Sequence, residues 1–454
     1  MGISLNSMEF YKKKYTKIGL KLIKINGKYA YRYITGKYSF DEITAMIADG
    51  YIPVATADEL DGLRNSSLRV MGSGTLWAGL YNTGLDKKYV RVANIDLSGF
   101  ANWNSIGDAN NDIFFEGEFD GNDLIINNFY STIGGLFDVV KNVKIKNISL
   151  NGNMAVLTND KGLLVNGITL QSVVESEISN VFVSGTVSGN GNIGGIVGRC
   201  NFNTEIDSCT FSGTVSGNDN IGGIGGFCKG EVINSKATGS ISGRDGVGGI
   251  AGRTDGGNIE KNDAININVT GSRFWTGGVV GFLRTGTTIR RCNSSGKVKN
   301  TATAGNGHAG GLLGLSSSAG DNSIYDSYSD CEVEVTAANS IGGLIGYHNT
   351  GNTVNNSYST GIVIGAGGIY VGGLIGRLDG TITNSYYDTD TSGQSDTGKG
   401  LPRTTAQLEN GTADSFINPD GTTDDTETPA NAMFTGWDDT IWDFTDTTKY
   451  PELL

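Results

Sequence analysis

The 454-residue sequence contains few of the residues from which metal centres, disulfide frameworks and catalytic bases are built. It has only two histidines, His308 and His348, and five cysteines, an odd number with no CxxC pair. This scarcity argues against a zinc site and against a disulfide framework. We therefore expect no cofactor and no metal centre.

Long hydrophobic runs are also missing, and proline is scarce, with only five residues. No stretch reaches the length of a transmembrane helix, and the basic N-terminal residues are followed by LKLIKINGKYAYRY, which is not an uninterrupted apolar segment. We therefore expect no membrane insertion and no secretion signal, and a chain made in the cytoplasm. The lack of a strict G-X-Y period excludes collagen, and an apolar content of 37% argues against wholesale disorder.

What the sequence has in excess is glycine, 70 residues, and much of it recurs in the motif hGGhhG, where h is an apolar residue. The copies are IGGLFD at Gly134 and Gly135, IGGIVG at Gly194 and Gly195, IGGIGG at Gly222 and Gly223, VGGIAG at Gly248 and Gly249, TGGVVG at Gly277 and Gly278, AGGLLG at Gly310 and Gly311, IGGLIG at Gly342 and Gly343, and VGGLIG at Gly372 and Gly373, with a degenerate copy, KGLLVN, at Gly162. Their spacing of roughly thirty residues is typical of a solenoid.

Two further segments keep phase with the glycine pairs: an h-x-x-S segment, as at 206–209, and an alternating segment such as SGTVSG at 212–217. Three short strands and three turns per period predict an all-β fold, a parallel β-helix of about nine three-strand coils with a triangular section, stacked ~4.8 Å apart. The glycine pairs are expected where the chain bends with positive φ or where no side chain fits between layers. Cys200 and Cys228 occupy equivalent positions and are expected to stack without forming a disulfide, because in-register parallel strands rarely allow the required dihedral angle.

The N-terminus differs from this body in charge. Residues 1–40 carry nine basic side chains against Glu9 alone, whereas the whole chain has a net charge of −13. We predict a basic attachment module over residues 1–49, with docking on an acidic protein favoured over nucleic acid. Asn26–Gly27 predicts a β-hairpin turn, and Ser39 with Glu42 and Thr56 with Glu59 predict capped helices. The attachment candidates are Lys12, Lys13, Lys14, Lys21, Lys24, Tyr29, Tyr31 and Tyr33.

The predicted order of segments is then an opening and capping layer over residues 50–132, the repeat solenoid over 133–388 and a C-terminal cap over 389–454. A short helix is expected at 404–410, closed by Gln407. Four aromatic residues follow, and we expect them to plug the open end of the last coil, with the chain ending at the tip of the rod: Trp437, Trp442, Phe444 and Tyr450.

These residues resemble the GLUG-repeat family of β-helical segments over about 50–454. The resemblance is carried by YVRVANIDLSGFANWNSIG with FFEGEFDGNDLIINNF, by the hGGhhG copies, and by SYYDTDTSGQS with GWDDTIWDF. The family occurs as non-catalytic parts of bacterial surface proteins, adhesins and IgA-cleaving peptidases, and in phage proteins. It implies a binding or bracing role and no catalytic residue.

Three groups of residues could carry chemistry. Glu116, Glu118 and Asp120 share one strand face, as paired carboxylates do in glycosidases, but they also fit the opening layer of the solenoid. Asp388, Asp390 and Ser392 match the start of a calcium loop, but Lys399 stands where the bidentate glutamate belongs, which favours an Asp-stabilised turn. Tyr328, Tyr358 and Tyr386 share a repeat column, which favours a buried ladder over a sugar-stacking platform.

From this organisation the sequence predicts a non-enzymatic virion protein: a tail or head fibre, or a receptor-binding spike, that binds a host surface glycan or protein without cleaving it. Its expected partners are other virion proteins, through the N-terminal module, and two further copies in a homotrimer, with no nucleic acid. The alternatives are a polysaccharide depolymerase that uses the solenoid carboxylates and an adhesin of the bacterial cell surface.

Overall fold

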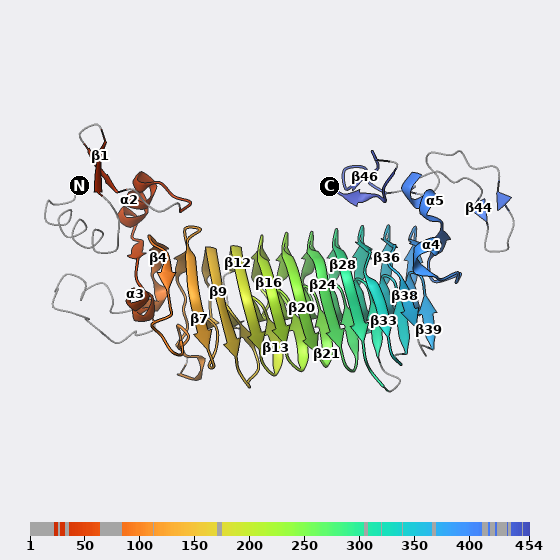
Figure 1. Ribbon diagram of the computed structural model, residues 1–454, viewed down its shortest axis with the longest axis horizontal. Helices are drawn as coiled ribbons and strands as arrows, with labels where there is room; N and C mark the ends of the chain where they lie inside the picture. Colours follow the sequence, from red (N-terminus) through yellow and green to blue (C-terminus); the bar gives the residue numbers. More distant parts are fainter. Residues whose placement is uncertain are drawn as a thin grey trace.

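The computed structural model describes residues 22–25, 28–31, 36–63, 84–111, 113–169, 175–303, 307–318, 320–337, 339–365, 369–410, 416–417, 423–424, 434, 437–446 and 448–454. Its body is a long rod of stacked β-coils (Figure 1), as the repeat predicts. Within the described residues, no helix is long and apolar enough to cross a membrane.

Two parallel sheets run along the rod and receive one strand from each coil. The first sheet contains β10 (Lys161–Gly162), β13 (Gly191–Gly194), β17 (Asp219–Gly222), β21 (Asp245–Gly248), β25 (Trp275–Gly277), β29 (His308–Gly310), β34 (Ser340–Gly342) and β39 (Tyr370–Gly372). The second contains β8 (Phe137–Val140), β11 (Val165–Ile168), β14 (Val197–Cys200), β18 (Gly225–Cys228), β22 (Ala251–Thr254), β26 (Val280–Leu283), β30 (Leu313–Ser316), β35 (Ile345–His348) and β40 (Ile375–Leu378).

The third sheet bends around a corner and so forms two columns of strands, which β9 (Lys144–Ala155) and β12 (Ser176–Ser188) span without a break. The other strands of its first column are β3 (Ile52–Val54), β4 (Lys88–Arg91), β6 (Glu118–Asp120), β15 (Thr204–Asp207), β19 (Glu231–Ile233), β23 (Asn258–Glu260), β27 (Thr288–Arg290), β31 (Ser323–Tyr325), β36 (Thr353–Asn355) and β41 (Thr381–Thr383). Those of its second are β5 (Ile95–Asp96), β7 (Ile125–Ser131), β16 (Thr210–Ser216), β20 (Lys236–Gly243), β24 (Asp263–Gly271), β28 (Asn293–Asn300), β32 (Tyr328–Ser329), β33 (Glu332–Val335), β37 (Tyr358–Ser359), β38 (Val363–Gly365), β42 (Tyr386–Asp388) and β43 (Leu401–Arg403).

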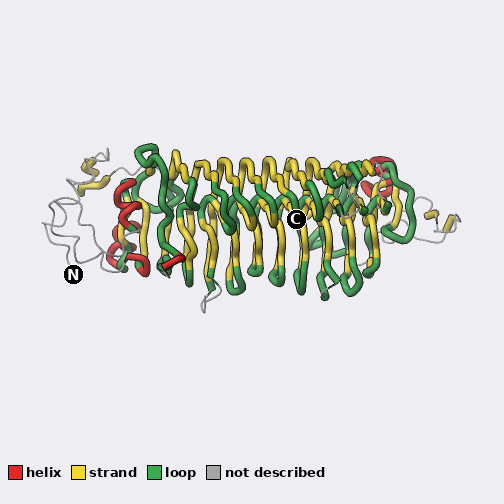
Figure 2. The backbone as a smooth tube through the Cα atoms, turned by 90° about the horizontal axis from the view of Figure 1, so that it is seen from below, coloured by secondary structure: helices red, strands yellow, loops and turns green. Residues whose placement is uncertain are grey.

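A coil in the middle of the rod therefore has four strands, β15 to β18 for example, where the sequence predicts three. Strands and connecting turns alternate from coil to coil along the rod (Figure 2). The difference arises at the glycine pair, because IGGIVG is not one strand. Gly194 ends β13, the chain turns at Gly195 and Ile196, and β14 begins at Val197. The motif is thus the corner between the first and the second sheet.

Close packing, and not positive φ, explains these glycines. None of the sixteen paired glycines has a backbone φ in the left-handed region. A Cβ on Gly343 would instead lie inside van der Waals contact with the carbonyl oxygen of Gly373 in the next coil and with Ser359 Oγ. The second of the two predicted reasons is therefore correct for this motif.

The left-handed backbone occurs at a different corner, between the two columns of the third sheet. One residue per coil has a φ between 44° and 55° there, and asparagine is the commonest choice. Asparagine adopts this region more readily than other non-glycine residues, because its short amide bonds locally. The column consists of Asn147, Asn180, Ser208, Asn234, Lys261, Arg291, Asp326, Asn356 and Asn384.

The interior holds stacked apolar side chains and all five cysteines, which are free and buried. Cys200 and Cys228 pair in register on β14 and β18, as the sequence predicts, and no disulfide joins them. Burial raises the pKa of Cys209, Cys292 and Cys331 to about 12, because a buried thiolate loses its hydration.

These thiols are expected to be unreactive in the folded protein. With Ellman's reagent at pH 8, we expect fewer than one thiol to react under native conditions and all five to react in 6 M guanidinium. Rapid reaction of two or more thiols in the folded protein would contradict the placement of the cysteines.

At the N-terminal end, two helices lie against the first coils. α2 (Phe40–Ala48) begins with the predicted capping box of Ser39 and Glu42. α3 (Ala57–Gly62) is capped by Thr56, while the Glu59 carboxylate accepts from the Ala55 N–H. Ile43 of α2 packs on Val90 and Val92, so residues 36–49 of the predicted attachment module contact the solenoid.

The C-terminal end is closed differently from the prediction. The residues that cover the last coil lie around α4 (Thr389–Ser392) and β43, and they act through polar groups. Lys399 Nζ donates to the carbonyl oxygens of Val371 and Gly376, and Asp396 accepts from the Gly373 N–H at 2.8 Å. An open parallel end exposes backbone donors and acceptors, which hydrogen-bonding side chains satisfy and aromatic rings do not.

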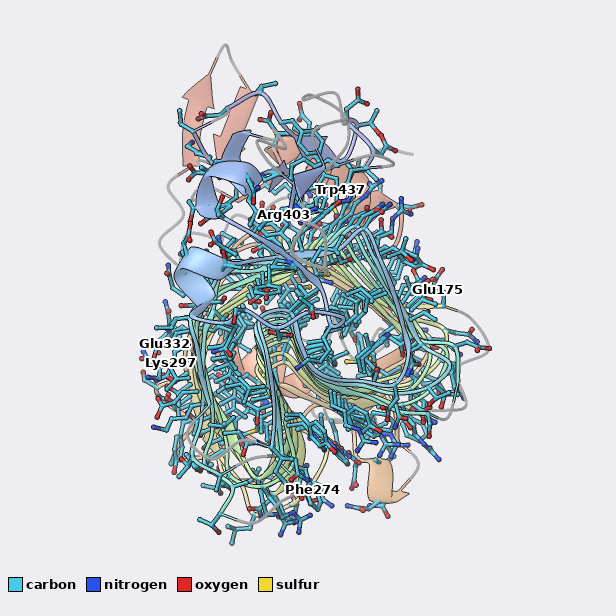
Figure 3. All side chains as sticks on the ribbon, turned by 90° about the vertical axis from the view of Figure 1, so that its right-hand side faces the viewer. Glu175, Phe274, Lys297, Glu332, Arg403 and Trp437 are labelled. Carbon is cyan, nitrogen blue, oxygen red and sulfur yellow. The ribbon has the colours of Figure 1, made fainter. Side chains whose placement is uncertain are left out.

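The prediction that four aromatic residues plug the open end is therefore wrong, because they pack against the tyrosine column on the flank of the rod. Beyond α5 (Thr405–Asn410), β46 (Trp442–Asp443) and the C-terminus lie above the coils of β28 and β36 in Figure 1, beside the C-terminal part of the rod. In the end view Trp437 lies above the coils (Figure 3). The sequence predicts that the chain ends at the tip of the rod, and the C-terminus does not lie there.

Candidate functional site

The carboxylates of β6 hold the N-terminal cap in place. Glu118 pairs with Lys146 at 2.7 Å and accepts from the Tyr51 hydroxyl at 2.6 Å. Asp120 is fully buried and accepts from Tyr38 Oη at 2.9 Å. Glu116, the third carboxylate of the group, is exposed before β6 and lies 3.4 Å from Lys141 Nζ. The structural interpretation is favoured, because the oxygens of Glu118 and Asp120 already bind neighbouring elements.

Asp388 is likewise used by the fold. Its Oδ1 caps α4 by accepting from the N–H groups of Asp390 and Thr391, and its Oδ2 accepts from Thr405 Oγ1 and Tyr450 Oη, each at 2.7 Å. Both oxygens of the would-be first calcium ligand therefore have protein donors. This is the Asp-stabilised turn that the sequence favours.

The tyrosine column forms the predicted ladder. Tyr328, Tyr358 and Tyr386 pair in register, and the rings of Tyr328 and Tyr358 stack at 5.0 Å with an interplanar angle of 3°. Trp437, Trp442 and Tyr450 cover this ladder from outside. The column is thus a buried anchor for the C-terminal segment, and it offers no free ring to a ligand.

A buried serine and histidine form the one other pair with a catalytic appearance in the described part of the chain. Ser316 Oγ lies 3.0 Å from His348 Nδ1, and both residues are fully buried inside the rod. Burial lowers the pKa of His348 to about 4, because the protonated ring would lose its hydration. The pair is closed to any polymer.

This pKa predicts acid sensitivity. The pKa of His348 in the folded protein lies below the ordinary value near 6.5, so between these two pH values the unfolded chain binds the proton more readily than the folded one. The free energy of unfolding is therefore highest above pH 6.5 and decreases as the pH falls toward 4. Between pH 6.5 and 5 we expect about 2 kcal/mol of stability to be lost through His348. In urea unfolding, His348→Gln should be less stable than the wild type at pH 7, but its free energy of unfolding should change less between pH 6.5 and 5. Equal changes with pH in the two proteins would contradict the lowered pKa of His348.

The predicted attachment residues fall mainly outside the described residues: Lys12, Lys13, Lys14, Lys21 and Tyr33. For Lys24, Tyr29 and Tyr31 the structure describes the backbone. β1 (Leu22–Ile25) and β2 (Lys28–Tyr31) pair antiparallel, with Lys24 opposite Tyr29 and Leu22 opposite Tyr31. A hairpin is thus formed as the Asn26–Gly27 pair predicts.

A different set of side chains lies on the outer side of the second sheet, where most of them are half-buried by their neighbours and two, Phe227 and Leu315, are 8% exposed. From β14 to β40, one outward position per coil is occupied by a cationic, aromatic or large apolar residue, each in register with the next. We call this set the strip; in order along the rod it is Arg199, Phe227, Arg253, Phe282, Leu315, Tyr347 and Arg377. Strand spacing places successive members ~4.8 Å apart.

Neighbouring side chains from the first sheet widen the strip. Trp275 of β25 stacks on Phe282 with a centroid distance of 4.1 Å, and His308 of β29 lies 5.3 Å from the ring of Tyr347. Arg377 reaches over both Tyr347 and Tyr370, at 4.4 and 5.4 Å. The two sheets therefore contribute rings to one continuous surface.

The arginines of the strip sit on ring faces. Arg253 lies 4.8 Å from the Phe227 ring and 5.6 Å from the Phe282 ring, and Arg199 lies 5.3 Å from Phe227. Such stacking holds a guanidinium flat and leaves its edge free to donate. Partial burial lowers the pKa of Arg253, because its charge loses water on both sides.

Charge is uneven along the strip. In its N-terminal half, Arg199 and Arg253 are flanked by Lys229 and Arg284, and Asp255 lies 3.1 Å from Arg284 and 3.7 Å from Arg253. In the C-terminal half Arg377 is paired with Asp379 at 2.8 Å. The N-terminal half therefore has the surplus of cations.

The sequence contains a signal for the strip that the repeat motif alone does not reveal. Its members are the residues that directly follow each hGGhhG copy, from Arg199 after IGGIVG to Arg377 after VGGLIG. The apolar and glycine positions of the motif were read, and the variable position after it was not.

Comparisons with known proteins give short or distant matches. No protein-family model matches the chain, so the GLUG-repeat resemblance remains a prediction. A protein of Evansella cellulosilytica provisionally named a Gly-rich membrane protein is 51% identical over 74 residues, 15% of this chain. The halomucin of Haloquadratum walsbyi is 32% identical over 133 residues, 28% of this chain. The matches span only 8% and 1% of these relatives.

Two solved structures have a similar course. One, from Bacteroides ovatus, is provisionally named an immunoglobulin A1 protease. Its sequence is 18% identical, the match covers 89% of this chain and 92% of the other, and the TM-score is 0.37. The other is an IgA1 protease, with 18% identity, coverage of 85% and 23%, and a TM-score of 0.33. Both bear the name of a protease, which contradicts the prediction that this chain is not an enzyme, and that prediction is withdrawn. At these scores neither structure assigns a reaction to this chain.

Proposed function

We propose that the chain is an elongated binding rod that attaches to a surface component, a glycan or a protein, through the strip. The observation that carries this proposal is the in-register row over seven successive coils, made of three arginines, three aromatic residues and one leucine. Folding alone requires no such row, because the interior ladders already bury the apolar side chains of each coil. Regular solenoids commonly use extended faces of this kind for binding.

The setting that we propose is a virion fibre or spike. The support is the charge asymmetry of the sequence: a basic segment over residues 1–40 precedes an acidic body, and such a segment suits docking on an acidic virion protein. In this setting the rod is a homotrimer and carries the strip away from the particle.

A bacterial cell surface is the alternative setting. It is favoured by the short stretches of identity to proteins named as a Gly-rich membrane protein and a halomucin. Immunogold labelling of cells and of any particles they release would distinguish the two settings, since the label should mark particles in the first case and cell envelopes in the second.

The binding itself can be tested with fluorescently labelled protein and intact cells of the bacterium that carries or hosts the gene. The double variant Phe227→Ala with Arg253→Ala should bind at least about tenfold more weakly than the wild type. Lys236→Ala, on an exposed position of β20, is the matched control and should bind normally. Equal binding of all three proteins would refute the proposal.

A further inference from the structure

A lysine amine of the N-terminal segment meets a side-chain amide of the solenoid. Lys37 Nζ donates to Asn147 Oδ1 at 3.0 Å, and Asn147 Nδ2 donates to Asp120 Oδ1 at 3.0 Å. Lys37 precedes α2, whereas Asn147 lies on β9 and Asp120 ends β6. The amine and the amide, 110 residues apart in the chain, are thus in direct contact beside a carboxylate.

The hydrogen bonds fix which side of the Asn147 amide faces the amine. Its Oδ1 accepts from a second donor, Asn180 Nδ2, at 2.7 Å, and its Nδ2 donates to a second acceptor, Tyr38 Oη, at 3.3 Å. Two donors on one atom and two acceptors on the other leave one consistent placement of the oxygen and the nitrogen. The Lys37 amine therefore lies at the carbonyl side of the amide, and the amide nitrogen faces the carboxylate.

The groups around this contact are held in place. The Lys37 N–H donates to Asn122 O at 3.0 Å, and the Tyr38 N–H donates to Asn122 Oδ1 at 2.8 Å. Tyr38 Oη donates to Asp120 Oδ2 at 2.9 Å; burial and this carboxylate raise the pKa of Tyr38, so the hydroxyl keeps its proton. Lys37 is an exposed residue, but Asn147 is 3% exposed and Asp120 0%. Bulk water therefore has little access to the amide that the amine contacts.

This arrangement has the parts that aminolysis of an amide requires: an amine held against the carbonyl, a donor to the carbonyl oxygen, and a carboxylate on the leaving nitrogen. The unprotonated Lys37 amine attacks Asn147 Cγ, and Asn180 Nδ2 stabilises the negative charge on Oδ1. A proton from Nζ passes through Asp120 to Nδ2, the Cγ–Nδ2 bond breaks, and ammonia leaves. The products are one secondary amide between Nζ and Cγ and one ammonia, so no oxidant, metal or cofactor is consumed.

We infer that Lys37 and Asn147 join in an intramolecular isopeptide bond that the protein forms by itself, with Asp120 as the catalytic acid and base. The bond ties the predicted attachment module to the third sheet of the solenoid by a covalent link. Such a cross-link restricts the unfolded chain and keeps the module on the rod when the rod is pulled. The inference does not depend on the strip or on what the strip binds.

Intact-mass spectrometry of the denatured full chain tests the bond. Wild-type protein kept at pH 8 and 37 °C should become lighter than its sequence by the mass of one ammonia. A tryptic digest should contain a branched peptide that joins residues 33–64 to residues 147–161, because trypsin does not cut after an acylated lysine.

Variants distinguish this bond from other losses of ammonia. Lys37→Arg keeps a cationic donor but removes the amine nucleophile, so this variant should keep its full mass. Asp120→Asn should form the bond at least about a hundredfold more slowly. Lys144→Arg, on the same strand as Asn147 but beside Glu177, is the matched control and should lose ammonia as the wild type does. Thermal melting of each variant checks that the coils are intact.

A wild-type mass equal to that of the sequence after this incubation would overturn the inference. Loss of ammonia that persists in Lys37→Arg, or that gives no branched peptide, would overturn it as well, because an asparagine that cyclises on its own backbone also releases ammonia. If Asp120→Asn is folded and forms the bond at the wild-type rate, the role assigned to the carboxylate is wrong.

Discussion

Substituting Gly343 by valine is expected to destabilise the rod by roughly 3 kcal/mol, the upper end of the range for overpacked interiors. The new Cβ would collide with the carbonyl oxygen of Gly373 and with Ser359 Oγ. The backbone cannot move away, because the Gly343 N–H donates to Gly373 O at 3.1 Å and Gly343 O accepts from Gly311. Thermal or urea unfolding followed by circular dichroism measures the loss.

Two control variants identify the cause. Gly343→Ala should already show much of the loss, because the Cβ itself makes the collision. Ser240→Val, at an exposed strand position of β20, should stay within about 0.5 kcal/mol of the wild type. Equal midpoints for Gly343→Val and Ser240→Val would contradict the account of the glycine corner.

Tyr358→Ala is expected to release the C-terminal segment from the flank at a cost of about 3–5 kcal/mol. The ring is almost fully buried, stacks on Tyr328 and lies against Trp437 and Trp442, and its hydroxyl donates to Pro451 O at 2.6 Å. Removing the ring opens a cavity in the cluster that holds this segment.

Limited proteolysis with chymotrypsin, followed by mass spectrometry, measures the release. The variant should lose residues 437–454 at least about tenfold faster than the wild type, while the coils remain resistant. Tyr325→Ala, on β31 outside this cluster, is the matched control and should be cut at the wild-type rate. Equal rates for Tyr358→Ala and the wild type would show that the aromatic cluster does not hold the segment.

The register of the coils could be read from the sequence because it repeats. Gly194, Gly222 and Gly248 pair in register as their spacing predicts, and so do Cys200 and Cys228. In a solenoid, equivalent positions stack by construction, so a one-dimensional pattern is enough. The capping boxes at Ser39 and Thr404 were also readable, because their bonds span three residues.

The return of the C-terminal segment could not be read in this way. Tyr358 and Pro451 are 93 residues apart, and no periodic pattern connects them. The fourth strand per coil was hidden because a glycine corner and a glycine inside a strand look alike in sequence. The strip was hidden for a third reason: its residue types vary from coil to coil, and only the geometry of the corner shows that they share one face.

Hydroxyl-radical footprinting of the wild-type protein, free and bound to intact cells, tests the central claim most directly, since it locates the bound face without any substitution. The account predicts that binding protects Trp275, Phe282 and Tyr347 from oxidation. Exposed side chains on the third sheet, such as Tyr130 and Phe182, should be oxidised at unchanged rates. Protection of these two residues with the strip still fully reactive would contradict the account.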